Sequence, residues 1–142
     1  MHTIQQILDL KGGDVWSVAP DDPVYEAIRR MAELGVGALL VMDGARLVGI
    51  LSERDYARRI ILEGRTSRET RVAEIMTADP ITITRNATAD HALAVMNERR
   101  IRHLPVTVDG HVVGLVSIGD LVSAVLEDQK QLIDQLQQYV SS

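Results

Sequence analysis

Two short segments carry the residues best suited to chemistry, and they nearly repeat one another. "GILSERD" runs from Gly49 to Asp55, and "GLVSIGD" runs from Gly114 to Asp120. Each segment ends in Ser-x-x-Asp, which is typical of the start of a helix. A helix N-terminus offers unpaired N–H groups and a positive dipole end, and both suit a phosphate. The Ser hydroxyl can donate to a phosphate oxygen, and the Asp carboxylate can accept from both vicinal hydroxyls of a ribose.

A structural interpretation of the same motif stays open. Ser at a helix N-cap with Asp three residues later is a variant of the capping box, in which each side chain accepts from the other's backbone N–H. This needs no ligand. The two interpretations are compatible, because a capped helix start can also face a ligand.

The motif is repeated because the whole chain is repeated. A shift of 65 residues, the separation of Gly49 and Gly114, aligns the two halves without a gap, and "ILDL" at 7–10 aligns with "VAEI" at 72–75. The other matched identities are Ala27 with Ala92, Met31 with Met96, Glu33 with Glu98, Leu39 with Leu104, Val41 with Val106, Val48 with Val113, Ser52 with Ser117 and Asp55 with Asp120.

Each copy predicts the same order of elements. A short alternating strand ("WSVAP" or "ITITR") precedes an amphipathic helix, which Gly35 ends in the first copy as a left-handed cap. Two strands follow, joined by Asp-Gly, and the second helix begins at Ser52 or Ser117. Pro105 predicts an edge position or an irregularity in its strand.

A single copy of about 50 residues buries little apolar surface. We therefore predict an α+β fold with two pseudo-symmetric β-α-β-β-α repeats packed through their sheets, plus a C-terminal helix. The expected boundaries are 1–66 for the first repeat with its lead-in, 67–126 for the second repeat, and 127–142 for the helical extension.

Composition excludes several classes of function. The chain has 142 residues and no Cys, so disulfides, thiolate metal sites and thiol catalysis are absent. The net charge of −5 disfavours nucleic acid and anionic membranes as partners. No apolar run approaches the roughly 20 residues that span a bilayer. We expect a soluble cytoplasmic protein without membrane or nucleic-acid partners.

Catalytic and metal motifs are missing as well. The four His residues, His2, His91, His103 and His111, do not have metal-ligand spacing. There is no nucleophile elbow and no Gly-rich P-loop. We therefore expect no catalytic residues, no metal site and no enzyme activity.

The duplicated unit resembles a tandem pair of CBS domains, also called a Bateman module. The resemblance rests on "VAEIMT", "IRHLPV", the G-x-x-S-x-x-D motif and the duplication, and it covers roughly Thr3 to Val125. The run "SERDYARRIILEGRTSRETRVAEIMT" further resembles short stand-alone CBS-pair proteins. The resemblance implies a sensor of cellular energy or redox state. Its ligand would be AMP, ADP, ATP, NAD(H) or S-adenosylmethionine, bound in the cleft between the repeats.

The resemblance also assigns site residues. It implies that Asp55 and Asp120 bind ribose, that Ser52 and Ser117 face the phosphate or ribose, and that both pockets are competent. Arg54, Arg102 and His103 are the basic residues expected near phosphate. The adenine slot is expected to include Ser17, Val18, Gly37, Ala38, Thr82, Ile83, Ile101 and Pro105.

The C-terminal segment carries one narrow apolar stripe. Its members are Leu121, Val125, Leu132, Leu136 and Tyr139, on a helix otherwise rich in Gln and Asp. The stripe suits a partner helix or its own module, and we expect a homodimer that it reinforces. An unidentified target protein would read the signal. The alternatives are an interaction module without physiological nucleotide binding and, less favoured, a nucleotide-processing enzyme.

Overall fold

The computed structural model describes residues 1–12 and 14–141, and they form two compact units. The first-repeat unit comprises residues 14–81. The second-repeat unit comprises residues 82–141 together with the N-terminal residues 1–12. Each unit has its own sheet and its own hydrophobic core.

The first-repeat unit is built on a sheet of four strands in the order β1-β2-β3-β4. Strand β1 is parallel to β2, whereas β2, β3 and β4 pair antiparallel. Its elements are β1 (Ser17–Val18), α2 (Val24–Leu34), β2 (Ala38–Asp43), β3 (Arg46–Ser52), α3 (Glu53–Tyr56), the π-helix η1 (Ala57–Ile61), α4 (Val72–Ile75) and β4 (Thr77–Ala78).

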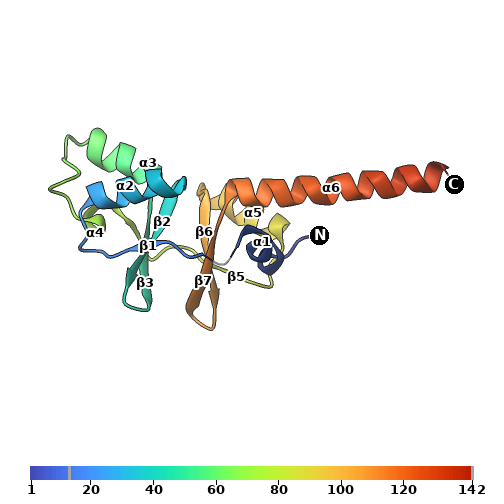
Figure 1. Cartoon of the computed structure of the whole chain (residues 1–142), viewed down its shortest axis with the longest axis horizontal. Helices are drawn as coiled ribbons and strands as arrows, with labels where there is room; N and C mark the ends of the chain where they lie inside the picture. The colour runs from blue at the N-terminus through green and yellow to red at the C-terminus, as the bar shows by residue number, and fades with distance from the viewer. Residues whose placement is uncertain (13, 142) are drawn as a thin grey trace. The chain divides into compact units, whose positions relative to one another are not determined.

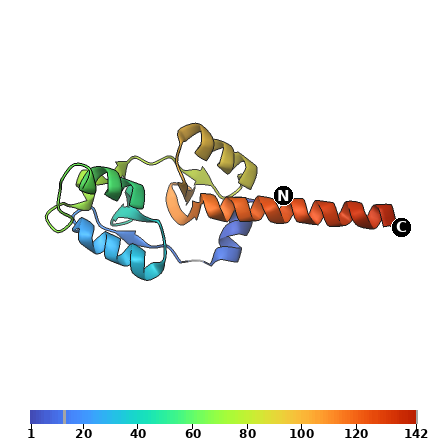
Figure 2. The same cartoon turned by 90° about the horizontal axis from the view of Figure 1, so that it is seen from above.

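The second-repeat unit repeats this plan around three strands in the order β5-β6-β7. Figure 1 labels its elements, and Figure 2 shows α6 from a second side as one uninterrupted helix. The elements are α1 (Ile4–Lys11), β5 (Ile83–Thr84), α5 (Ala89–Arg99), β6 (His103–Val108), β7 (His111–Ser117) and α6 (Ile118–Ser141). Both units thus contain the predicted β-α-β-β-α order, and the predicted α+β class with a C-terminal helix is confirmed.

The lead-in segments belong to the opposite repeats. Helix α1 precedes the first repeat in sequence, but its Ile4, Ile7 and Leu8 pack into the core of the second-repeat unit. Helix α4 precedes the second repeat, and its Val72 and Ile75 pack into the core of the first-repeat unit. The compact units therefore divide the chain at other positions than the boundaries expected from the sequence, which lie after residues 66 and 126. The reason is that the apolar face of each lead-in helix packs into the core of the other repeat.

The motif glycines make room for these lead-ins. A Cβ on Gly114 would lie 2.6 Å from Leu8 Cδ2, and a Cβ on Gly49 would lie 2.5 Å from Met76 Sδ. Real Cβ atoms do not approach other atoms so closely, so a side chain at Gly114 would force Leu8 to move. A side chain at Gly49 would displace Met76 and would also lie 2.9 Å from the backbone oxygen of Thr77. The Gly that starts the repeated motif is therefore explained by packing against the lead-in.

Local backbone features follow the sequence at Gly35, and at Pro105 the irregularity is found without the edge position. Gly35 caps α2 in the left-handed region at φ 67°, as predicted. Pro105 lies in β6, the middle strand rather than an edge, beside a register irregularity between Val106 and Thr107. A middle strand accepts this Pro because the parallel pairing with β5 begins only at Val106.

Helix α6 changes surroundings along its length. Leu121 and Ala124 are buried in the core of the second-repeat unit, whereas residues 129–141 are all exposed. The helix thus leaves its own core after about two turns. Among residues 1–12 and 14–141, no helix is long and apolar enough to cross a membrane.

Candidate functional site

The first Ser-x-x-Asp motif forms a capping box at the start of α3. Ser52 ends β3 and is the N-cap, and its Oγ accepts from Asp55 N–H at 3.2 Å. Asp55 Oδ2 accepts from Ser52 N–H at 2.9 Å and from the Ser52 hydroxyl at 3.1 Å. The capping interpretation of this motif is therefore confirmed, and it orients both side chains at the end of β3.

The second motif has the same geometry at the start of α6. Asp120 N–H donates to Ser117 Oγ at 3.2 Å, and Ser117 N–H donates to Asp120 Oδ2 at 2.8 Å. Both side chains are half-buried, so they are fixed by local bonds and still reach solvent. The duplicated sequence therefore produces two sites with the same local construction.

The neighbouring strand brings a second pair of predicted residues to each motif. Glu53 N–H donates to Gly37 O at 3.0 Å, and Ala38 pairs with Ser52 in the sheet. In the other unit Ile118 N–H donates to Arg102 O at 2.8 Å. His103 pairs there with Ser117. The Gly-Ala pair and the Arg-His pair therefore occupy equivalent places beside the two motifs.

The short first strands supply the remaining predicted positions. Ser17 pairs with Leu40 in the parallel β1–β2 ladder, and Ile83 pairs with Val106 between β5 and β6. The predicted site residues differ in burial. The buried ones are Val18, Ala38, Ile83 and Pro105, and the exposed ones are Thr82 and Arg102. The half-buried ones are Ser17, Gly37, Ser52, Arg54, Asp55, Ile101, His103, Ser117 and Asp120. In each unit the Ser-x-x-Asp motif thus lies beside the start of the neighbouring strand, and the first strand pairs with residues further along that same strand.

The two acidic residues differ in their contacts with the lead-ins. Lys11 Nζ donates to Asp120 Oδ2 and to Leu115 O, both at 2.7 Å. Burial alone would raise the pKa of Asp120, but the Lys11 ammonium and the Ser117 N–H outweigh burial and lower that pKa. In the other unit the neutral Thr77 hydroxyl donates to Asp55 Oδ1 at 3.4 Å.

Sequence reasoning missed Lys11. It lies 109 positions from Asp120, and no local pattern connects the two residues. One signal was present in the repeat, because the 65-residue shift aligns Lys11 with Met76 at the end of the duplicated lead-in.

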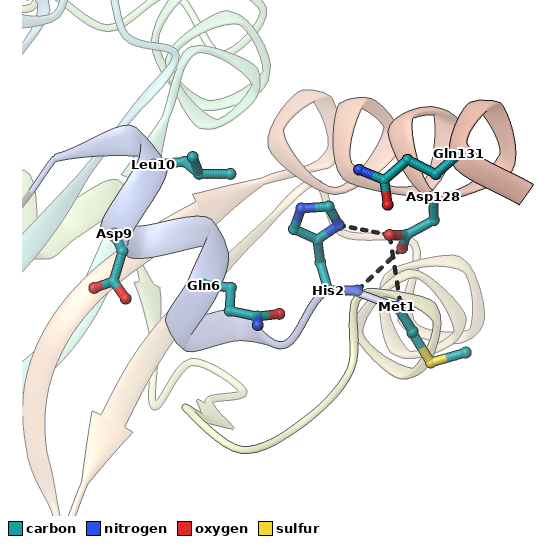
Figure 3. Close-up of a pocket in the computed structure, with 7 residues that line it drawn as sticks. All are labelled: Met1, His2, Gln6, Asp9, Leu10, Asp128 and Gln131. Carbon is teal, nitrogen blue, oxygen red and sulfur yellow. Dashed lines mark hydrogen bonds and ion pairs between the residues drawn. The ribbon is translucent and has the colours of Figure 1, made fainter. Parts of the chain in front are cut away.

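A pocket of about 410 Å³ lies between α1 and α6 of the second-repeat unit. Figure 3 shows His2 and Asp128 at its side, with the His2 ring Nδ1 2.8 Å from Asp128 Oδ1. Burial works to raise the pKa of Asp128, but the hydrogen bonds from His2 outweigh it and lower that pKa. Its lining residues are Met1, His2, Gln6, Asp9, Leu10, Asp128 and Gln131. This pocket contains none of the predicted nucleotide-binding residues.

A metal centre has no counterpart in the described part of the chain. Residues 1–12 and 14–141 contain no group of three or more His, Cys, Asp or Glu side chains arranged to hold a metal ion.

Comparison with known proteins places both repeats in one family. The family model described as "CBS domain" matches residues 9–62 and 72–127. The mitochondrial CBS domain-containing protein CBSX3 of Arabidopsis thaliana is 38% identical over 148 residues, covering 97% of this chain and 71% of that protein. A longer Arabidopsis relative is 41% identical over 96 residues, and the matched region spans only 18% of its length.

Solved structures agree with the fold. A protein with CBS domains from Burkholderia ambifaria MC40-6 matches with a TM-score of 0.86 and 48% identity, covering 90% of this chain and 96% of that one. The CBS domain pair of protein MJ0100, solved with 5′-methylthioadenosine and S-adenosyl-L-methionine, matches with a TM-score of 0.77. It is 24% identical, and the match covers 87% of this chain and 99% of that chain.

Proposed function

Because the chain belongs to the CBS domain family and carries two CBS domains in tandem, we propose that it is a regulatory module that binds an adenosine-containing ligand. The observation that carries this proposal is the duplicated site, in which a capped Ser-x-x-Asp motif lies beside the start of the neighbouring strand in each unit. A protein that only needed a capped helix would not need the same neighbouring positions in both copies.

The geometry supports a ribose contact for the two acids. Asp55 and Asp120 are held by backbone N–H groups and remain half-buried. A fixed carboxylate loses little freedom when it accepts from two vicinal hydroxyls, so preorganisation favours binding. Backbone groups of the first strands, in which Val18 and Ile83 are buried, would then take the edge of the base, with aliphatic side chains on its faces.

The ligand class is supported by a relative with the same fold. The CBS domain pair of MJ0100 was solved with two adenosine derivatives, one charged and one neutral at sulfur. For this chain we propose AMP, ADP, ATP, NAD(H) or S-adenosylmethionine as ligand. The basic residues Arg54, Arg102 and His103 would favour members that carry phosphate.

The proposed mechanism is a shift of population between conformations of the module. A ligand that binds one conformation more tightly than another raises the population of the tighter-binding conformation. The largest shift in the free energy between the conformations equals the difference in binding free energy. A target protein that contacts only one conformation would then respond to ligand concentration. Regulation of this kind needs no catalytic residue.

A thermal-shift panel followed by calorimetry tests the proposal. A ligand that binds the folded state raises the melting temperature, and at 100 times Kd it adds about 2.7 kcal/mol of stability. The panel contains AMP, ADP, ATP, NAD⁺, NADH and S-adenosylmethionine. Asp120→Ala and Asp55→Ala should each remove one binding event. Thr88→Ala is the matched control, because it also removes a helix cap but Thr88 is the N-cap of α5 and belongs to neither motif.

Other outcomes identify the alternatives. If no member of the panel binds at millimolar concentration, the nucleotide proposal is wrong and an interaction module becomes the better interpretation. Release of phosphate or adenine from a panel member would instead identify an enzyme.

We also propose that the chain forms a homodimer to which α6 contributes. Leu132, Ile133 and Leu136 are each more than half exposed, and Tyr139 and Val140 more than four-fifths. These five residues lie beyond the part of α6 that packs on its own unit. A second copy offers the same stripe and makes the contact self-complementary.

Sedimentation velocity tests this assembly. Leu136→Glu should convert dimer to monomer at micromolar concentration, because it places a charge in the apolar contact. Gln137→Glu is the matched control, since it adds the same charge at the next exposed position. A monomeric wild-type protein, or a Leu136→Glu variant that remains dimeric, would contradict the role of α6.

A further inference from the structure

Lys11 forms an ion pair with Asp120 in the structure. Its ammonium lies 2.7 Å from Asp120 Oδ2 and 2.7 Å from Leu115 O. The Lys11 side chain is 39% exposed and the Asp120 side chain 25%. The ion pair therefore lies at the surface of the second-repeat unit, where an entering ligand can reach it.

The position of Lys11 is fixed by packing rather than by the ion pair alone. Lys11 is the last residue of α1, and Leu8, one turn earlier, packs against the bare Cα of Gly114. Ile4 and Ile7 anchor the same helix in the core. Helix α1 therefore ends beside the end of β7, and the Lys11 side chain remains within reach of Asp120 after any displacement.

The ion pair uses an oxygen that a ribose would need. Asp120 Oδ2 already accepts from Ser117 N–H, and Lys11 Nζ bonds the same oxygen. A vicinal diol that donates one bond to each carboxylate oxygen meets Lys11 at Oδ2. The diol must therefore displace the ammonium or lose one of its two bonds.

The other unit has no such cation at the equivalent position. Repeat alignment places Met76 where Lys11 stands, and Asp55 receives a 3.4 Å hydrogen bond from the neutral Thr77 hydroxyl instead. A neutral donor at that distance is weaker than a 2.7 Å charged one. The two sites thus also differ in the donors that contact the ribose acid.

We infer that Lys11 is a specificity-determining residue that competes with ribose hydroxyls for Asp120, so that the second-repeat site binds adenosine more weakly than it would without this cation. The inference rests on the proposed function, because it concerns the ribose acid of that site. It adds a difference between the sites that the repeated motif does not contain. A ligand that takes both carboxylate oxygens of Asp120 must break the Lys11–Asp120 ion pair, and the first-repeat unit has Met76 at the position equivalent to Lys11.

The expected effect is modest and measurable. Surface ion pairs contribute up to about 1 kcal/mol, which corresponds to about fivefold in affinity. Lys11→Met copies the residue of the other repeat and should tighten adenosine binding at the second-repeat site about fivefold. Lys11→Arg keeps a cation at this position and should leave the affinity within about twofold of the parent protein.

Adenosine is the right probe because it has a ribose and no charge. Screening by salt weakens an exposed ion pair and leaves the bonds of a neutral ligand nearly unchanged. Adenosine affinity at this site should therefore rise with salt when Lys11 is present. In the Lys11→Met variant the affinity should be flat between 50 and 500 mM NaCl.

Calorimetric titration of the full chain with adenosine tests the inference. An Asp55→Ala background isolates the second-repeat site, and Lys11→Met and Lys11→Arg are compared in it. If the Asp55→Ala protein is poorly folded, the backbone amide signals of Ser117 and Asp120 in the chain with Asp55 intact report the same site by NMR.

Each outcome decides the matter. Tighter binding in Lys11→Met alone, together with loss of the salt effect, supports the inference. Unchanged or weaker adenosine binding in Lys11→Met overturns it and leaves the proposed function standing. If adenosine binds neither the parent protein nor any variant, the same comparison made with AMP decides the inference. If no member of the nucleotide panel binds either, both the proposed function and this inference are overturned.

Discussion

Gly114 gives the sharpest test of how the lead-in helix packs on the second repeat. A Cβ at this position would lie 2.6 Å from Leu8 Cδ2 and 3.0 Å from Leu8 Cδ1, whereas carbon atoms in contact are separated by about 3.5–4.0 Å. Gly114→Ala therefore forces Leu8 to move by about 1 Å inside a packed core. Overpacking of this size costs about 1–3 kcal/mol of unfolding free energy.

A double-mutant cycle separates this overpacking from any general effect of the new methyl group. Leu8→Ala alone should cost about 2–5 kcal/mol, because it removes a buried side chain and leaves a cavity. In the double variant the new methyl group occupies part of that cavity. The double variant should therefore be more stable than the sum of the two single effects by at least about 1 kcal/mol.

Urea unfolding followed by far-UV circular dichroism measures all four proteins. Gly119→Ala in helix α6 is the matched control, since a Cβ at this position would make only an ordinary 3.7 Å contact with Ser117 Oγ. It should be neutral or stabilising by up to about 1 kcal/mol. Additive costs within about 0.5 kcal/mol, or a Gly114→Ala protein as stable as the parent, would refute the close contact between α1 and β7.

Three further predictions concern caps and charge. Gly35→Ala should destabilise the chain by about 1 kcal/mol, because φ 67° disfavours a side chain even though no atom lies within 4 Å of its Cβ; equal stability in urea would contradict this. Thr88→Ala should cost about 1 kcal/mol by removing the bond from His91 N–H to the Thr88 side chain, and thermal unfolding checks it. The lowered pKa of Asp120 contributes stability that is present above the unfolded pKa of about 3.9 and is lost as pH falls through the folded pKa. Lys11→Met should therefore reduce the loss of unfolding free energy between pH 5 and pH 3, and identical pH profiles would show that Lys11 does not set this pKa.

The repeat, its order of elements and both Ser-x-x-Asp motifs were predictable from the sequence. Local rules decide them, since Asp-Gly specifies a hairpin, Gly35 specifies a left-handed cap, and Ser with Asp three residues later specifies a capping box. Because the two copies align at a shift of 65 residues, the hairpin and the capping box were predicted in both copies. These interactions join residues that are close in sequence, so they could be predicted without tertiary information.

Other features depended on contacts between distant residues. Pro105 was expected at an edge or irregularity, and only the assembled sheet shows it in the middle strand beside the register shift. The first turns of α6 are buried and its last turns are exposed, although one apolar stripe runs along both. Periodicity identifies an apolar face, but the neighbouring elements determine how far along the helix that face is covered.

By itself the sequence determined the duplicated unit and the capping of its two motifs, because those depend on short-range backbone rules applied at a fixed repeat. The tertiary structure alone decided that each lead-in completes the opposite repeat's core and that Lys11 reaches Asp120. A glycine in the sequence indicates that another group can pack closely, but it does not identify that group. Only the tertiary structure shows that Leu8 of α1 packs against Gly114. The two Ser-x-x-Asp motifs already differ in charge in the sequence, because Glu53 and Arg54 stand where Ile118 and Gly119 stand in the second copy, and the fold adds Lys11 as a further difference.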